Sequence, residues 1–132
     1  MMNIQGIDHV VLRVRDLEGA VDFYHRVLGC PVERRQDAIG MVQMRAGHAL
    51  IDLVSIDGTL GQRGGAAPGR DGHNMDHFCL ALLDFDPDVV RSQLERQGVA
   101  VGEIGSRFGA GGEGISLYFT DPEGNRIELR GA

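Results

Sequence analysis

Lysine is absent from this 132-residue chain, and all thirteen basic residues are arginine. Without lysine the chain cannot form a Schiff base with a carbonyl substrate, and it lacks the lysine of a phosphate-binding loop. The formal net charge of −6 also argues against nucleic acid as a partner, because binding of the phosphate backbone requires a basic face. Schiff-base chemistry and a phosphate-binding loop lysine are therefore excluded, and nucleic acid is disfavoured as a partner.

Long apolar runs and cysteines are also scarce. No segment approaches the roughly 18 apolar residues that span a bilayer, and the N-terminus lacks the basic and apolar regions of a secretion signal. We therefore expect a cytoplasmic protein without a membrane partner. Only two cysteines, Cys30 and Cys79, are present. They are too few for a disulfide framework, and we interpret both as small apolar residues in a reducing compartment.

An internal repeat is the main feature that the sequence does contain. Residues 6–56 and 75–130 each begin with a strand carrying an Asp-His pair, continue into an aspartate-capped helix that stops at a glycine, and end in further strands. The glycine-rich residues 57–74 join them. We predict a single α+β domain over residues 1–132, in which two βαβββ modules form a curved mixed sheet around a metal-binding cavity.

Hydrophobic periodicity gives the expected elements of each module. The first module is predicted to contain a strand at 6–15, a helix at about 17–28, and strands at 31–36, 39–46 and 48–56. The second is predicted to contain a strand at 75–83, a helix at 87–97, a strand at 99–103 and a hairpin at 115–130. Residues 57–74 and 105–114, both rich in glycine, are interpreted as mobile lids.

The two halves can be superimposed residue by residue. Asp8-His9 matches Asp76-His77 at the start of each module, and Asp52 matches Glu128 on each last strand. If the halves pack about a pseudo-twofold axis, two imidazoles and two carboxylates meet at one point. Two nitrogen and two oxygen ligands suit a divalent transition metal. The alternative for each residue alone is an inert polar group at the edge of a strand.

The repeated Asp-His pairs and the closing stretch Asp-Pro-Glu-Gly-Asn-Arg-Ile-Glu-Leu, residues 121–129, resemble the vicinal oxygen chelate family. This family is also called the glyoxalase, bleomycin-resistance and extradiol dioxygenase superfamily, and the resemblance covers nearly the whole chain. It implies that His9, His77 and Glu128 are metal ligands. Asp52 falls where glyoxalase I has a longer carboxylate, so Asp52 is a ligand, a base or neither. Pairing of modules between chains in that family implies a homodimer.

The same resemblance implies a function. The leading expectation is a metal-dependent lyase or isomerase that uses Zn, Ni, Mn or Fe, binds a small oxygenated substrate through two oxygens, and has Glu128 and Asp52 as catalytic residues. An alternative is an extradiol dioxygenase, because two histidines and a glutamate also form the facial triad of Fe(II) oxygenases. A third is a non-catalytic drug- or metabolite-binding protein. Residues 108–119 resemble the small members grouped with glyoxalase-domain-containing protein 5.

A few further side chains are candidates for roles near such a site. His73 is predicted to be a loop residue close to it, and Tyr118 either lines the cavity or belongs to the core. Arg13, Arg107 and Arg126 are candidates for binding an anionic substrate, with an ordinary surface role as the alternative for each.

Overall fold

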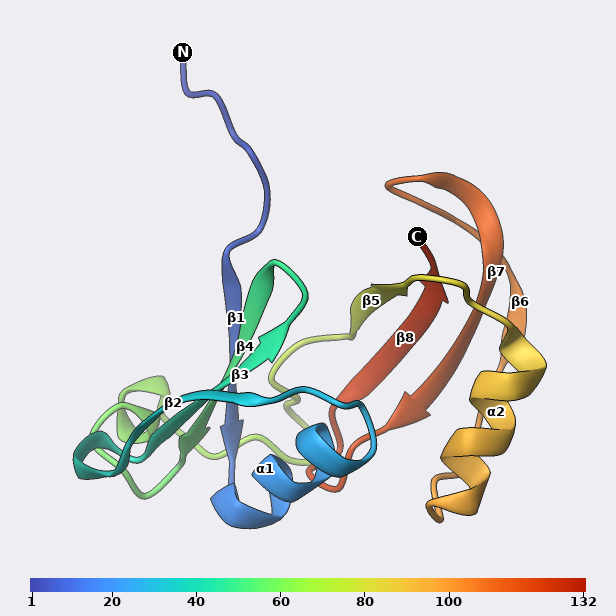
Figure 1. The fold of residues 1–132 in the computed structure, drawn as a ribbon. Helices are drawn as coiled ribbons and strands as arrows, with labels where there is room; N and C mark the ends of the chain where they lie inside the picture. The colour runs from blue at the N-terminus through green and yellow to red at the C-terminus, as the bar shows by residue number, and fades with distance from the viewer. The chain divides into compact units, whose positions relative to one another are not determined.

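The computed structural model describes residues 1–132 and divides the chain into two compact units, residues 1–74 and 75–132. Each unit contains one four-stranded mixed sheet and one α-helix (Figure 1). The predicted α+β class with two βαβββ modules is confirmed, and each module forms a sheet of its own. None of the helices combines the length and the apolar character needed to cross a bilayer.

The first unit follows the order strand, helix, three strands. Its elements are β1 (His9–Val14), α1 (Leu17–Arg26), β2 (Val32–Gln36), the short η1 (Asp37–Ile39), β3 (Met41–Ala46), β4 (Ala49–Ser55) and the short η2 (Gly61–Gly64). The sheet order is β1-β4-β3-β2, with β1 parallel to β4 and the other pairs antiparallel. The Asp16 side chain caps α1 by accepting from the Gly19 amide at 3.0 Å. Helix α1 packs on β3 and β4.

The second unit repeats this order. Its elements are β5 (Phe78–Leu82), α2 (Pro87–Arg96), β6 (Ile104–Gly109), β7 (Gly112–Thr120) and β8 (Arg126–Gly131). The sheet order is β5-β8-β7-β6, with β5 parallel to β8. The Asp86 side chain caps α2 ahead of Pro87. Asp121 closes the turn between β7 and β8, because its Oδ1 accepts from the amides of Glu123 and Asn125.

Two expectations for the second unit are wrong. Residues 99–103 form no strand. Residues 105–114 are no mobile lid but most of the β6–β7 hairpin. Glycine here makes space: a Cβ at Gly109 would lie 2.0 Å from Nη1 of Arg130, and one at Gly114 would lie 3.0 Å from Nη2. The Arg130 guanidinium lies against these glycines and donates to the Gly112 carbonyl at 2.6 Å. The glycines therefore admit a buried arginine to the sheet.

Candidate functional site

In the first unit, His9 and Asp52 lie close together on the β1–β4 pair. Parallel register places Val11 opposite Asp52, so His9 is two residues from the carboxylate and on the same face of the sheet. Asp52 is 4% exposed, and its Oδ1 accepts from the Gln43 side-chain amide at 3.2 Å. The Nδ1 of His9 lies 2.7 Å from Oδ1 of Asp8. This hydrogen bond, followed by the charge of Asp52, raises the pKa of His9.

A cavity of about 560 Å³ lies over this pair. Its polar lining includes His9, Asp52 and His73, and apolar side chains from β3, β4 and the following loop complete it. The prediction that His73 is a loop residue is confirmed. The cavity is large enough for a small metabolite.

Arg13 fixes one wall of this cavity. Its guanidinium donates to three carbonyls of the glycine-rich loop, those of Gly61 at 3.3 Å, Gly65 at 3.1 Å and Ala66 at 2.9 Å. The Asn74 side chain brackets the Arg13 backbone, donating to its carbonyl at 3.0 Å and accepting from its amide at 3.3 Å. The hypothesis that Arg13 binds an anionic substrate therefore loses support, because its guanidinium is engaged with the loop.

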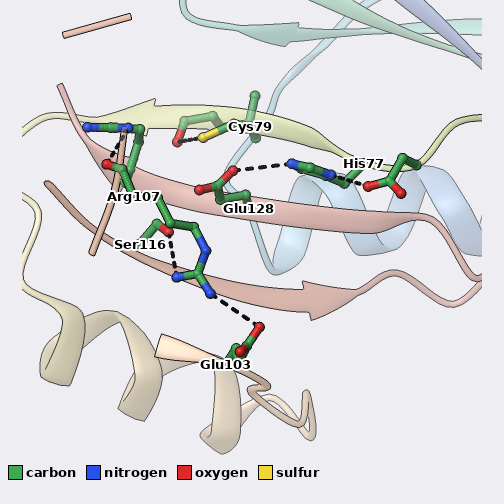
Figure 2. A network of polar contacts seen from close by, with 9 residues as sticks. His77, Cys79, Glu103, Arg107, Ser116 and Glu128 are labelled. Atoms are coloured by element: carbon green, nitrogen blue, oxygen red, sulfur yellow. Dashed lines mark hydrogen bonds and ion pairs between the residues drawn. The ribbon is translucent and has the colours of Figure 1, made fainter. Parts of the chain in front are cut away.

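In the second unit, His77 and Glu128 make direct contact. Register in the β5–β8 pair places Cys79 opposite Glu128, as Val11 lies opposite Asp52 in the first unit. His77 Nε2 lies 3.4 Å from Glu128 Oε2, and His77 Nδ1 lies 2.5 Å from Asp76 Oδ1 (Figure 2). The two ring nitrogens of His77 therefore face two carboxylates, Nδ1 toward Asp76 and Nε2 toward Glu128.

Glu128 is buried but ionised. It is 7% exposed, and burial by itself raises the pKa of a carboxyl. Hydrogen bonds from Ser116, Tyr118 and Cys79, together with the charge of His77, outweigh burial and place the pKa of Glu128 below its usual value. Burial and the charge of Glu128 raise the pKa of the Cys79 thiol to about 11. At neutral pH this site therefore places a carboxylate beside the His77 ring, with the uncharged Cys79 thiol next to it.

The two units thus contain the same arrangement of donors. Two atoms bound at about 2.1 Å to one cation with a tetrahedral angle between them lie about 3.4 Å apart. The separation of 3.4 Å between the nearest imidazole and carboxylate atoms of His77 and Glu128 fits that requirement. Neither unit by itself gathers three or more histidine, cysteine or acidic side chains into a metal-binding group. Each unit therefore brings together one histidine and one buried carboxylate, a pair that we call a half-site.

Sequence reasoning missed the residues that orient these donors. The sequence pattern shows Asp8 and Asp76 only as members of the repeated Asp-His pairs, yet each lies within hydrogen-bonding distance of Nδ1 of the histidine that follows it. An acidic residue adjacent to a candidate ligand in both repeats was the available signal. Ser116, which is fully buried under Glu128, carried no signal, because its role depends on the pairing of β7 with β8.

Tyr118 connects the half-site of the second unit to nearby arginines. Its ring is 8% exposed and meets the His77 ring edge-on, with the ring centroids 5.3 Å apart. The guanidinium carbons of Arg107 and Arg126 lie 4.8 and 4.2 Å from the centre of the same ring. Tyr118 is therefore a largely buried residue whose contacts include the candidate ligands.

The comparisons with known proteins decide the family. The family model of the Glyoxalase/Bleomycin resistance protein/Dioxygenase superfamily matches residues 6–129. The chain belongs to this superfamily. The glutathione transferase FosA of Serratia marcescens is 29% identical over 96% of this chain and 80% of its own length. Methylmalonyl-CoA epimerase of Bos taurus is 26% identical over 98% of this chain and 76% of its own length.

A further relative also has a solved structure. Virulence protein STM3117 of Salmonella typhimurium is 31% identical over 97% of this chain and 85% of its own length. Its crystal structure matches this superfamily member with a TM-score of 0.72 over 98% of both chains. The relatives carry names of different reactions, so the family is shared while the chemistry differs among its members.

Proposed function

We propose that this protein is a metal-dependent enzyme of the glyoxalase type. It binds a small substrate through two oxygen atoms and moves a proton at a carbon next to a carbonyl. The observation that carries the proposal is the 3.4 Å approach of His77 Nε2 to Glu128 Oε2, with Nδ1 of His77 held by Asp76. A half-buried imidazole and a buried carboxylate aligned in this way form a typical edge of a divalent metal site.

We further propose that His9 and Asp52 complete the ligand set, from the same chain or from a second copy in a homodimer. Support comes from the equivalence of the two half-sites, since each places a histidine two residues before the position opposite a buried carboxylate. When bound, a divalent cation such as zinc, nickel, manganese or iron would act as a Lewis acid and favour negative charge on a coordinated substrate oxygen.

Other residues of the chain orient the ligands and accept the proton. Asp8 and Asp76 hold the two imidazoles in the orientation that exposes Nε2. Ser116 and Tyr118 donate to Glu128 and hold its carboxylate in place. Asp52, where it does not serve as a ligand, accepts the proton that leaves the substrate carbon, since it lines the cavity above His9.

Proton transfer at a carbon is favoured as the reaction class because one relative is named methylmalonyl-CoA epimerase. Inversion at the carbon between two carbonyls requires removal and return of its proton. The similarity to FosA, a glutathione transferase, supports chemistry on small substrates in general. A catechol dioxygenase activity and binding without turnover are the other outcomes that the experiments distinguish.

Metal content tests the ligand set. We expect the wild type to hold divalent metal, and the His77→Ala and Glu128→Gln variants to lose most of it, because removal of one of few protein ligands cripples affinity. His48→Ala is the matched control, since His48 lies in the exposed turn between β3 and β4. Elemental analysis after gel filtration measures the result. Equal metal content in all four proteins would contradict the proposal.

Mixing of two inactive variants tests whether the halves combine between chains. If His9 of one chain and His77 of another share a centre, a refolded 1:1 mixture of His9→Ala and His77→Ala contains heterodimers with one intact centre of two. The mixture then recovers about one quarter of the wild-type metal content. No recovery places the complete centre within one chain.

Isotope exchange tests the reaction class. The metal-loaded protein is incubated in D₂O with methylmalonyl thioesters or with the hemithioacetal of methylglyoxal and glutathione, and mass spectrometry follows deuterium at the carbon next to the carbonyl. We expect incorporation by the wild type and none by His77→Ala. Oxygen consumption on catechols under iron loading, without deuterium incorporation, would establish the dioxygenase instead.

A further inference from the structure

Two guanidinium groups flank Tyr118 in the second unit. Tyr118 pairs with Glu128 across β7 and β8, while Arg126 follows the turn at the start of β8 and Arg107 lies on β6. The guanidinium carbons lie 4.2 and 4.8 Å from the centre of the Tyr118 ring. Alternation along β8 places Arg126 on the same face as Glu128. Positive charge is therefore concentrated beside the candidate metal ligand.

The charge of Arg126 has no anionic partner. Arg126 is exposed and forms no ion pair, although the chain carries nineteen acidic residues against thirteen basic ones. Stacking on an aromatic ring at an exposed site contributes only about 0.5–1 kcal/mol, and it leaves the N–H donors at the edge of the guanidinium unused. The guanidinium of Arg126 therefore keeps its charge and its edge N–H donors available to an external anion.

Arg107 contributes charge that is only weakly offset. Its Nη1 donates to Ser116 Oγ at 3.4 Å and its Nη2 lies 3.2 Å from Glu103 (Figure 2). The Glu103 side chain is 72% exposed, so this pair is screened by solvent and holds the guanidinium loosely. Ser116 in turn donates to Glu128. Arg107 is thus linked through one hydroxyl to the proposed metal ligand.

A third arginine adds to the same face. Arg130 follows Glu128 by two residues and is 8% exposed, and its terminal nitrogens donate only to the carbonyls of Arg107 and Gly112. Its Nε is buried without any hydrogen-bond partner. A buried cation with no carboxylate partner is costly, and it makes the face of the sheet that carries Glu128 more positive.

We propose that Arg126 and Arg107, stacked on Tyr118, bind an anionic group of the substrate, a carboxylate or a phosphonate. This inference rests on the proposed function, because it takes the coordinating oxygens of the same substrate to face His77 and Glu128. Arg126 and Tyr118 also line a depression of about 290 Å³ whose wall includes Glu103 and the backbone of Gly102. The planar guanidinium edge suits both anions, since each offers two oxygens to a pair of N–H donors.

Anion binding by the full-length, metal-free protein tests the proposal without any need for activity. Sodium methylphosphonate and sodium acetate are titrated separately at constant ionic strength, and the arginine Nε–H signals are followed by two-dimensional NMR. We expect saturable shifts at Arg126 and Arg107 with both anionic probes, and none with neutral diethyl methylphosphonate. Shifts that never saturate, or that are equal for all arginines, would overturn the proposal.

Variants identify the groups that bind. Arg126→Met should weaken methylphosphonate binding by about tenfold or more, because a charge-assisted hydrogen bond contributes about 1.5–3 kcal/mol. Glu103→Gln should tighten it, since the competing carboxylate is removed. The matched controls are Arg91→Met and Glu95→Gln, which alter an exposed pair on α2 whose atoms lie 2.9 Å apart. Equal effects of Arg126→Met and Arg91→Met would refute the assignment.

The metal and the anion experiments fail independently. Arg126→Met should retain the metal content of the wild type, because Arg126 is no ligand. Loss of anion binding in this variant with metal retained supports the anion site. Saturable anion binding by a protein that holds no metal would leave this subsite in place and remove the proposed function. Metal binding without any saturable anion binding would leave the proposed function in place and remove the anion subsite.

Discussion

Substitution of Arg13 by methionine should free the glycine-rich loop that walls the cavity of the first unit. Arg13 donates to the carbonyls of Gly61, Gly65 and Ala66, and methionine keeps much of the apolar stem while removing every donor. The cavity lining includes both Arg13 and Gly64 of this loop. The change should therefore act on the wall of the cavity and leave the sheet beneath it intact.

The magnitude follows from the three hydrogen bonds. Two of them are exposed to solvent, so we assign each a contribution near the lower part of the usual range, about 0.7 kcal/mol. Their sum, about 2 kcal/mol, corresponds to about a 30-fold increase in the population of the open loop. The amides of Gln62, Arg63 and Gly65, which bond to carbonyls within the loop, should exchange faster by that factor.

Hydrogen exchange followed by mass spectrometry measures this effect on peptides that cover residues 57–74. Arg45→Met is the matched control, because Arg45 is an arginine of the same unit that pairs with the exposed Glu33 at 2.8 Å. The control should leave loop exchange unchanged. Unchanged exchange in Arg13→Met, or an equal increase in β3 and β4, would refute the view that Arg13 holds this loop specifically.

Three further predictions concern the second unit of the metal-free protein. The Cys79 thiol, whose pKa is raised from 9.0 to about 11, should react with a disulfide reagent at pH 8 about tenfold more slowly than an unperturbed thiol of pKa 9.0, because the smaller thiolate fraction outweighs the greater nucleophilicity of the more basic thiolate. It should react faster in Glu128→Gln. Because the folded-state pKa of Glu128 is lowered, this carboxylate adds stability above its unfolded pKa, near 4.5. That stability is lost as the pH falls through the folded pKa, so Glu128→Gln should flatten the acid limb of denaturant-measured stability between those values. Gly109→Ala should destabilise the fold by about 1–3 kcal/mol, since the added Cβ would lie 2.0 Å from Arg130 Nη1. The control Gly111→Ala should leave the stability unchanged, because a Cβ at Gly111 meets open space. Equal melting temperatures for the two variants would contradict the packing argument.

Local pattern was enough to predict much of the fold. Aspartate caps at Asp16 and Asp86 precede both helices as predicted, because capping depends on a side chain and the amides that follow it within a few residues. The hairpin around Asp121 was predictable for the same reason, since its turn bonds span at most four residues. Interactions of short sequence separation leave a signature in the order of the residues.

The glycine-rich segment 105–114 was predicted wrongly because its explanation lies elsewhere in the chain. Glycine usually indicates a loop, but here Gly109 and Gly114 make room for Arg130 of a different strand. The hydrogen bonds of Arg13 could not be predicted for a related reason, since its partners lie about 50 residues later in the sequence. Neither the contact of the glycines with Arg130 nor the hydrogen bonds of Arg13 alter the sequence pattern near the residues involved.

By itself the sequence determined the two repeated modules, the capped helices, and the four polar positions shared by the halves, because each depends on residue order and periodicity. Only the tertiary structure decided that His77 lies 3.4 Å from Glu128, that Asp8 and Asp76 orient the imidazoles, and which arginines are engaged. The physical reason is strand register: which side chains lie opposite one another is set by pairing between distant segments, and a shift of one residue would turn each carboxylate to the other face.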